Sequence, residues 1–294
     1  MKSLLMNDRQ RLWYGALSRG EAELHTSQFG EDVVINTRLR KQLGGFYVDI
    51  GAFHPFSLSN TALLHYERGW RGLNVDLDER AIRLFEQARP GDINLCCAVG
   101  REEGEMEAMT FDNATFNTLD PARQLRFADK LEGATRRIVR VRTLASLLAE
   151  HVPPDATFDF LNVDVEGLDH DVLAGNDWTR WRPRVIAVET HGFDPGKPGE
   201  NAVFRLLTGQ GYRLQSHVFV TSIYTRWGLR AGASTQPRGS AGRRAGRGAT
   251  GRGCAHRAAR RPAAASRRLG PRRPGAPRGL WRAAQAADPC RSGP

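Results

Sequence analysis

The sequence predicts a doubly wound α/β domain, in which helices cover both faces of a mostly parallel sheet. The apolar run Phe46–Ile50 contains one acid, has the length of a strand buried on both faces, and is followed at once by Gly51. The segment Ala62–Arg68 has the pattern of a helix and leads into a second strand, Arg71–Asp76, which ends in an acid. A third apolar run, 157–164, repeats the strand pattern later in the chain. Strand, glycine turn, helix, strand and terminal acid are typical of the nucleotide-binding half of this fold.

The chain before the first strand predicts two helices. Residues 1–26 are polar with scattered Leu12, Trp13 and other apolar residues, and we expect an N-terminal helical extension there. Between 29 and 39 apolar residues recur at helical intervals. Gln28 and Glu31 precede or open that helix, and one interpretation is that they belong to its capping turn.

The remaining elements follow from periodicity and from the positions of glycine and proline. We expect helices over 79–88, 144–151, 168–174 and 200–209, and strands over 92–99, 104–111, 137–143 and 185–189, with 211–215 and 218–224 as an antiparallel closing pair. The segment 111–120 is polar and aromatic without periodicity. It is either a substrate-contacting loop over the strand ends or a plain surface loop.

The turn after the first strand restricts the choice of nucleotide. A dinucleotide site uses G-x-G-x-x-G, whereas this turn has Gly51 alone and a proline, which argues against NAD or FAD. S-adenosylmethionine has no phosphates, so fewer glycines suffice. Asp76 can accept hydrogen bonds from both ribose hydroxyls, and Asp49 is costly in a buried strand without partners, so we expect both acids to serve the cofactor. A side chain at position 51 is expected to fill space beneath the cofactor.

Six motifs, in order and at characteristic spacings, resemble the FkbM-type S-adenosylmethionine-dependent methyltransferases. They are SQFGED at 27–32, VDIGA at 48–52, SNT at 59–61, GWRG at 69–72, NVD at 74–76 and DFLNVDVEG at 159–167. The match runs from about residue 27 to residue 224. The turn departs from the glycine-rich form common in methyltransferases, although Gly-Ala with a nearby proline looks like one branch of this family.

The resemblance implies a class I methyltransferase (Rossmann-like) fold over residues 27–228. It also implies S-adenosyl-L-methionine as cofactor and methyl transfer to a hydroxyl of a sugar or other small metabolite. It places the segment that contains Gln28 and Glu31 over the cofactor end of the sheet. Binding of the cofactor is therefore the alternative to a capping role for these two residues. The residues expected to bind the cofactor are Gln28, Glu31, Asp49, Gly51, Ala52, Asn60, Asp76 and, near the adenine, Ala98.

Candidates for the chemistry follow the later strands. Methyl transfer needs the acceptor oxygen held about 3 Å from the methyl group and a group that takes its proton. Asp164 and Glu166 match the D-x-E-G signature of the family, and strand alternation would put both on one side, where either could orient the acceptor, take the proton or bind a cation. Glu166 could instead cap the next helix. His191 is a candidate base and His54 a third candidate group. Asp164, Glu166, Glu189 and His191 together offer ligands suited to Mg²⁺ or Mn²⁺. A divalent cation is therefore an open alternative to a metal-free site.

Composition is uneven along the chain. Residues 1–229 carry 27 Lys and Arg against 31 Asp and Glu, whereas residues 230–294 carry 16 Arg and one acid. The net charge of +11 therefore comes from the tail rather than from the catalytic domain. The four cysteines show no metal-binding spacing, which fits a reducing cytoplasm. No apolar run approaches a membrane span and the N-terminus lacks a secretory signal, so we expect a cytoplasmic enzyme.

The tail, 229–294, has no pattern from which to build a core. From residue 230, 50 of 65 residues are Arg, Ala, Gly or Pro, which predicts disorder. Such a composition arises from a frameshift in a GC-rich gene or belongs to an arginine-rich arm that binds nucleic acid non-specifically through phosphates. A non-catalytic nucleic-acid binder and another Rossmann-type, nucleotide-dependent enzyme are the alternative functions. Salt-dependent nucleic-acid binding that survives deletion of the tail would favour the binder, and an absorbance or fluorescence signature retained on purification would favour the nicotinamide enzyme.

Overall fold

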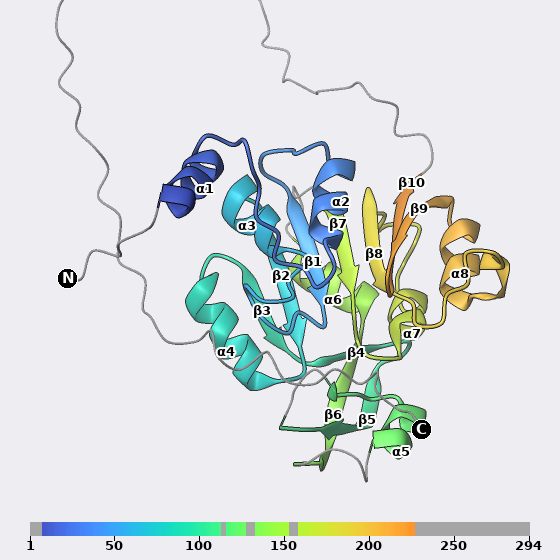
Figure 1. Ribbon diagram of the computed structural model, residues 1–294. Helices are drawn as coiled ribbons and strands as arrows, with labels where there is room; N and C mark the ends of the chain where they lie inside the picture. The colour runs from blue at the N-terminus through green and yellow to red at the C-terminus, as the bar shows by residue number, and fades with distance from the viewer. Residues whose placement is uncertain (1–7, 113–115, 128–132, 153–157, 227–294) are drawn as a thin grey trace, which may run out of the picture. The chain divides into compact units, whose positions relative to one another are not determined.

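The computed structural model describes residues 8–112, 116–127, 133–152 and 158–226 (Figure 1). Its helices are α1 (Asp8–Ser18), α2 (Glu31–Arg38), α3 (Ala62–Arg68), α4 (Glu79–Ala88), α5 (Pro121–Phe127), α6 (Leu144–His151), α7 (Asp169–Ala174) and α8 (Ala202–Gly209), with a 3-10 turn at Pro198–Glu200. Its strands are β1 (Phe46–Ile50), β2 (Arg71–Asp76), β3 (Ile93–Cys96), β4 (Ala98–Gly100), β5 (Gly104–Thr110), β6 (Thr135–Thr143), β7 (Phe158–Val163), β8 (Val185–Glu189), β9 (Tyr212–Val218) and β10 (Thr221–Arg226). The predicted tail, 229–294, lies outside the described residues.

The main sheet has seven strands in the order β3-β2-β1-β7-β8-β10-β9. β1 pairs in parallel with β2 and with β7, and β7 in parallel with β8. β10 runs antiparallel to both β8 and β9. The strand order reverses between β1 and β7, and in doubly wound folds ligands bind at the carboxyl ends of the strands at such a point. The prediction of a mostly parallel sheet with an antiparallel closing strand is confirmed.

Helices cover both faces of this sheet, as the alternation along β1 requires. Val48 and Ile50 belong to the apolar cluster that α6, α7 and α8 contribute to. Tyr47 belongs to a separate cluster with Ile35 of α2 and Leu64 of α3. Because side chains alternate along a strand, Asp49 faces the same side as Tyr47, beneath the start of α3.

Local signals explain why α3 occupies residues 62–68. The Ser59 hydroxyl accepts hydrogen bonds from the backbone N–H groups of Thr61 and Ala62 and so satisfies donors of the first turn. Gly69 ends the helix with φ of 68°, a left-handed conformation that favours glycine. The predicted helix is confirmed.

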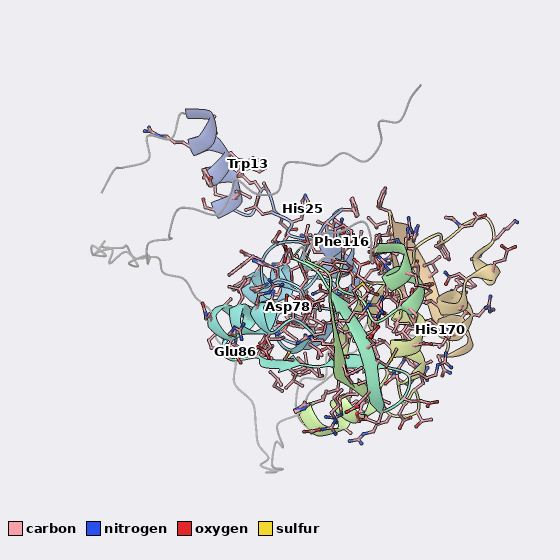
Figure 2. All side chains as sticks on the ribbon, turned by 90° about the horizontal axis from the view of Figure 1, so that it is seen from below. Trp13, His25, Asp78, Glu86, Phe116 and His170 are labelled. Carbon is pink, nitrogen blue, oxygen red and sulfur yellow. The ribbon has the colours of Figure 1, made fainter. Side chains whose placement is uncertain are left out.

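Two element predictions need correction, and one helix was not predicted. The predicted strand 92–99 is divided at Cys97 into β3 of the main sheet and β4 of a second sheet. The closing pair is shifted because the turn falls at Phe219, which has φ of 53°. α5 was not predicted, because its few apolar residues give no helical period. α1 falls within the predicted N-terminal extension, and its Leu12 and Trp13 are exposed (Figure 2).

The second sheet, β4-β6-β5, forms a small layer with its own apolar cluster. β6 is exposed over its first half, and Val141 is buried between the exposed Arg140 and the half-buried Arg142. The loop after β5 returns to it through backbone hydrogen bonds between Met109 and Thr118. These bonds bring residues 116–120 of the predicted loop toward the strand ends of the main sheet.

Candidate active site

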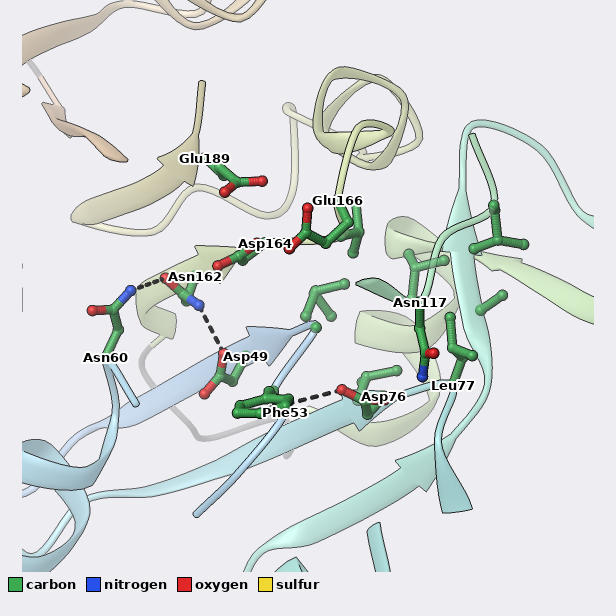
Figure 3. Close-up of a pocket in the computed structure, with 18 of the residues that line it drawn as sticks. Asp49, Phe53, Asn60, Asp76, Leu77, Asn117, Asn162, Asp164, Glu166 and Glu189 are labelled. Carbon is green, nitrogen blue, oxygen red and sulfur yellow. Dashed lines mark hydrogen bonds between the residues drawn. The ribbon is translucent and has the colours of Figure 1, made fainter. Parts of the chain in front are cut away.

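A cavity of about 150 Å³ opens to solvent at the carboxyl ends of β1, β2 and β7. Asp49, Asp76 and Asp164, which the sequence places on three separate strands, all line it. Of the residues predicted to form the site, those that line the cavity are Gln28, Asp49, Gly51, Ala52, Asn60, Asp76, Ala98, Asp164, Glu166 and Glu189. Figure 3 shows Glu189, Asp164 and Glu166 along one side and Asp49 and Asp76 along the other.

Three candidate residues lie outside the lining. The carboxylate of Glu31 is buried and accepts the N–H of Phe29 at 2.8 Å and the hydroxyl of Thr221 at 3.5 Å. His191 has its Nε2 3.0 Å from Oε1 of Glu189. The Nδ1 atom of His54 accepts the backbone N–H groups of Phe56 and Ser57, so this ring holds the turn together.

Asp49 is held by side-chain donors that the sequence reading did not single out. Its carboxylate accepts the Thr61 hydroxyl at 2.7 Å and the Asn162 side-chain amide at 2.9 Å. Burial raises the pKa of Asp49, while these two hydrogen bonds oppose the rise. Asn60 in turn donates to Asn162 at 3.0 Å (Figure 3), and Oδ1 of Asn60 is buried without a partner among the described residues.

A fully buried arginine, Arg89, supports the same network from below. Its guanidinium donates to the hydroxyls of Thr61 and Tyr47 at 2.9 Å each and to the carbonyl of Pro55 at 2.6 Å. It thereby connects the partner of Asp49 to the turn that follows β1. The sequence signal for Asn162 is its place in the motif at 159–167, and the structure sets it opposite Asp49 in the paired strands. Arg89, at the end of α4, carries no such signal.

Asp76 is fixed by the backbone and keeps acceptor capacity. Its Oδ2 accepts the N–H of Phe53 at 2.8 Å and its Oδ1 accepts the N–H of Asp78 at 2.7 Å. A carboxylate has about four lone-pair sites, so two remain for a ligand in the cavity. Burial raises the pKa of Asp76 to about 6, and the charges of Asp78 and Asp49 add to the rise.

Gly51 allows the ends of two strands to approach one another. Its φ is 77°, and a Cβ built on it would lie 1.7 Å from the backbone oxygen of Asp164. The expectation that a side chain here would fill space beneath the cofactor is therefore wrong. Glycine is required because β1 and the segment after β7 meet at this point. There the N–H of Asp164 donates to the carbonyl of Ile50.

The opposite side of the cavity is strongly acidic. Asp164 and Glu166 follow the end of β7, and Glu166 has φ of 57°, so strand alternation does not explain their common side as the sequence reading supposed. Glu166 forms an ion pair with Arg123 and does not cap α7; Asp169 instead accepts the N–H groups of Val165 and Gly167. Burial, followed by the charge of Glu189, raises the pKa of Glu166 to about 7 and that of Asp164 well above its usual range.

The family model described as the methyltransferase FkbM domain matches residues 49–214, more than half of the chain. The chain belongs to the FkbM methyltransferase family. It is an S-adenosylmethionine-dependent methyltransferase with a class I methyltransferase-like fold. The matched range contains the cavity-lining acids, whereas Gln28 and Glu31 precede it.

Three solved structures similar to this member of the FkbM family are of methyltransferases. The TehB-like SAM-dependent methyltransferase from Corynebacterium glutamicum is 14% identical, with 74% of this chain and 96% of that chain covered and a TM-score of 0.33. Precorrin-6y C5,15-methyltransferase from Geobacter metallireducens is 14% identical, with coverages of 66% and 86% and a TM-score of 0.33. The O-methyltransferase from Bacillus cereus in complex with SAH is 11% identical, with coverages of 75% and 91% and a TM-score of 0.30. No curated protein matches the chain. Among the described residues, no helix is long and apolar enough to cross a membrane.

Proposed function

We propose that the enzyme transfers a methyl group from S-adenosylmethionine to a hydroxyl of a sugar or other small metabolite. The observation that carries this proposal is the division of the cavity, with Asp76 on one side and the carboxylates of Asp164 and Glu166 on the other (Figure 3). The first side suits the donor and the second suits an acceptor hydroxyl that must lose a proton. We propose residues 27–228 as the catalytic domain, with 1–26 as an extension and 229–294 as a separate tail.

The residues of the donor side fit S-adenosylmethionine. Asp76 keeps two acceptor sites for the ribose hydroxyls, as described above, and lines the cavity. Oδ1 of Asn60, buried and without a partner among the described residues, can accept a hydrogen bond from the ligand's ammonium group. Gln28, Ala52 and Ala98 complete this side, and no glycine-rich phosphate loop is needed for a ligand without phosphates.

The acceptor side supplies the proton chemistry. The sulfonium group provides an activated methyl, so the chain's own residues need only position the acceptor oxygen and take its proton. We assign proton acceptance to Glu166, because it lines the cavity and Arg123 holds its side chain in place. Asp164 orients the acceptor, and His191, which is exposed and paired with Glu189, positions that carboxylate rather than acting as the base.

Calorimetric titration of the full chain with S-adenosylhomocysteine tests the donor side through Asp76. Replacing Asp76 with alanine should weaken binding by about 1–3 kcal/mol, the range for losing a charged hydrogen-bond acceptor. Since the pKa of Asp76 is about 6 and both ribose hydroxyls need the ionised carboxylate, affinity should fall as pH is lowered through about 6. The loss should approach tenfold per pH unit below that point, where protons compete with the ligand.

The amide variant Asp76→Asn removes the charge of the side chain but keeps its shape, so it shows how much of the affinity depends on the charge. It should bind more weakly than the wild type at about pH 7.5 and show a flat pH profile. Asp78→Asn is the matched control, because Asp78 caps α4 and accepts from Arg80 without lining the cavity. Equal affinity in Asp76→Ala and the wild type would rule out this donor site.

A further inference from the structure

A cluster of carboxyl groups lies where β7 and β8 end. One carboxylate oxygen from each of Asp164, Asp169 and Glu189 lies within 4.8 Å of the other two. Like charges at such distances repel strongly where water is scarce. Two cationic side chains lie near the cluster: Arg123 pairs with Glu166, outside it, and His191 contacts it only through Oε1 of Glu189. The ion pairs found among the described residues include neither Asp164 nor Asp169.

A buried unpaired oxygen points to a ligand at this cluster. Glu189 is only 8% exposed, and its Oε2 is buried with no hydrogen-bond partner among the described residues. Figure 3 shows the Glu189 carboxylate on the same side of the cavity as Asp164 and Glu166. A carboxylate oxygen that is removed from water and left without a donor is costly, so an occupant that supplies positive charge is needed to offset that cost.

We propose that Asp164, Asp169 and Glu189 bind a hard divalent cation, Mg²⁺ or Mn²⁺. Three carboxylates and no sulfur are the ligands such ions prefer. In an octahedral site with ligands at about 2.1 Å, ligand oxygens lie about 3–4.2 Å apart, so the three side chains need only draw together slightly. Asp169 is already oriented by the N–H groups of Val165 and Gly167. Asp164 and Glu189 line the cavity, so coordination positions are left facing it.

A cation at this position would activate the acceptor hydroxyl. That role rests on the proposed function, whereas the binding of the cation does not depend on it. A hydroxyl that coordinates a divalent cation loses its proton more readily. The proton passes to Glu166, and the oxygen attacks the methyl carbon while the electrons of the sulfur–carbon bond remain on sulfur. The products are the methyl ether, S-adenosylhomocysteine and one proton on the carboxylate, so the step needs no other reactant.

Titration with Mn²⁺, followed by the electron paramagnetic resonance signal of the free ion, tests the site in the full chain without methyl donor or acceptor. We expect one saturable site from which Mg²⁺ displaces Mn²⁺. Glu189→Gln and Asp164→Asn should each weaken Mn²⁺ binding at least tenfold. Asp171→Asn is the matched control on α7, because Asp171 pairs with Arg101 outside the cavity, and it should bind Mn²⁺ as the wild type does.

A thermal unfolding measurement in chelator shows whether a variant has merely failed to fold. Glu189→Gln should unfold at the same temperature as the metal-free wild type or higher, because it removes repulsion. Absence of saturable Mn²⁺ binding, or unchanged binding in a folded Glu189→Gln variant, overturns the proposed cation site. Titration of the same protein with S-adenosylhomocysteine distinguishes the two proposals. If the protein binds S-adenosylhomocysteine but not Mn²⁺, only the proposed cation site is rejected. If it binds Mn²⁺ but not S-adenosylhomocysteine, only the proposed donor site is rejected.

Discussion

Replacing Glu166 with glutamine should lower turnover by about 10²–10⁴-fold, the usual contribution of a positioned proton acceptor. The amide keeps the shape of the side chain and a contact with Arg123, but it cannot take the acceptor's proton. Glu166 lines the acceptor side of the cavity and lies apart from Asp76, so affinity for S-adenosylhomocysteine should stay nearly unchanged. Turnover is measured as formation of S-adenosylhomocysteine with a hydroxylated acceptor that the wild type methylates.

The control for this substitution is Glu107→Gln on β5. Glu107 also pairs with an arginine, Arg136, but on the exposed side of the small sheet and away from the cavity. It should retain wild-type turnover. A loss of less than tenfold in Glu166→Gln would mean that the sulfonium needs only a correctly placed oxygen, and the assignment of proton acceptance to Glu166 would be wrong.

The sheet could be predicted from the sequence because its strands are strongly apolar and end at glycines or acids. β1, β2, α3 and α4 begin and end at the predicted residues, and the antiparallel closing pair is present. The division of 92–99 could not be predicted, since one apolar run feeds two sheets and the break at Cys97 depends on tertiary pairing with β6. The turn at Phe219 was missed for a related reason, because Val218 to Tyr224 reads as one continuous strand.

The candidate site was only partly accessible to sequence reasoning. Acids within or just after an apolar strand can be recognised in the sequence because a buried charge needs a function or a partner. Asp49, Asp76 and Asp164 are such acids, and all three line one cavity. The partners of such acids give no comparable signal. Asn162 and Arg89 come from distant parts of the chain, and only folding brings them to the network around Asp49.

The sharpest test of how the two halves of the site are joined is Gly51→Ala. The added methyl would lie 1.7 Å from the carbonyl oxygen of Asp164, a backbone atom that cannot move without separating β1 from the segment after β7. Overpacking of this kind costs about 1–3 kcal/mol or more, and the left-handed φ of 77° adds about 1–2 kcal/mol. We expect the free energy of unfolding, measured with urea, to fall by about 3 kcal/mol or more, with loss of S-adenosylhomocysteine binding.

Gly69→Ala measures the cost of the left-handed backbone conformation alone. It thereby separates that cost from the cost of the contact that a side chain at position 51 would make. Gly69 has φ of 68°, close to that of Gly51, but a Cβ there would have nothing within 4 Å. Its replacement should therefore cost only the backbone strain of about 1–2 kcal/mol and leave S-adenosylhomocysteine binding intact. The difference between the two variants then measures the approach of the strand ends at Gly51. Equal destabilisation in both would show that this approach does not constrain the site, and the glycine would be required for its φ alone.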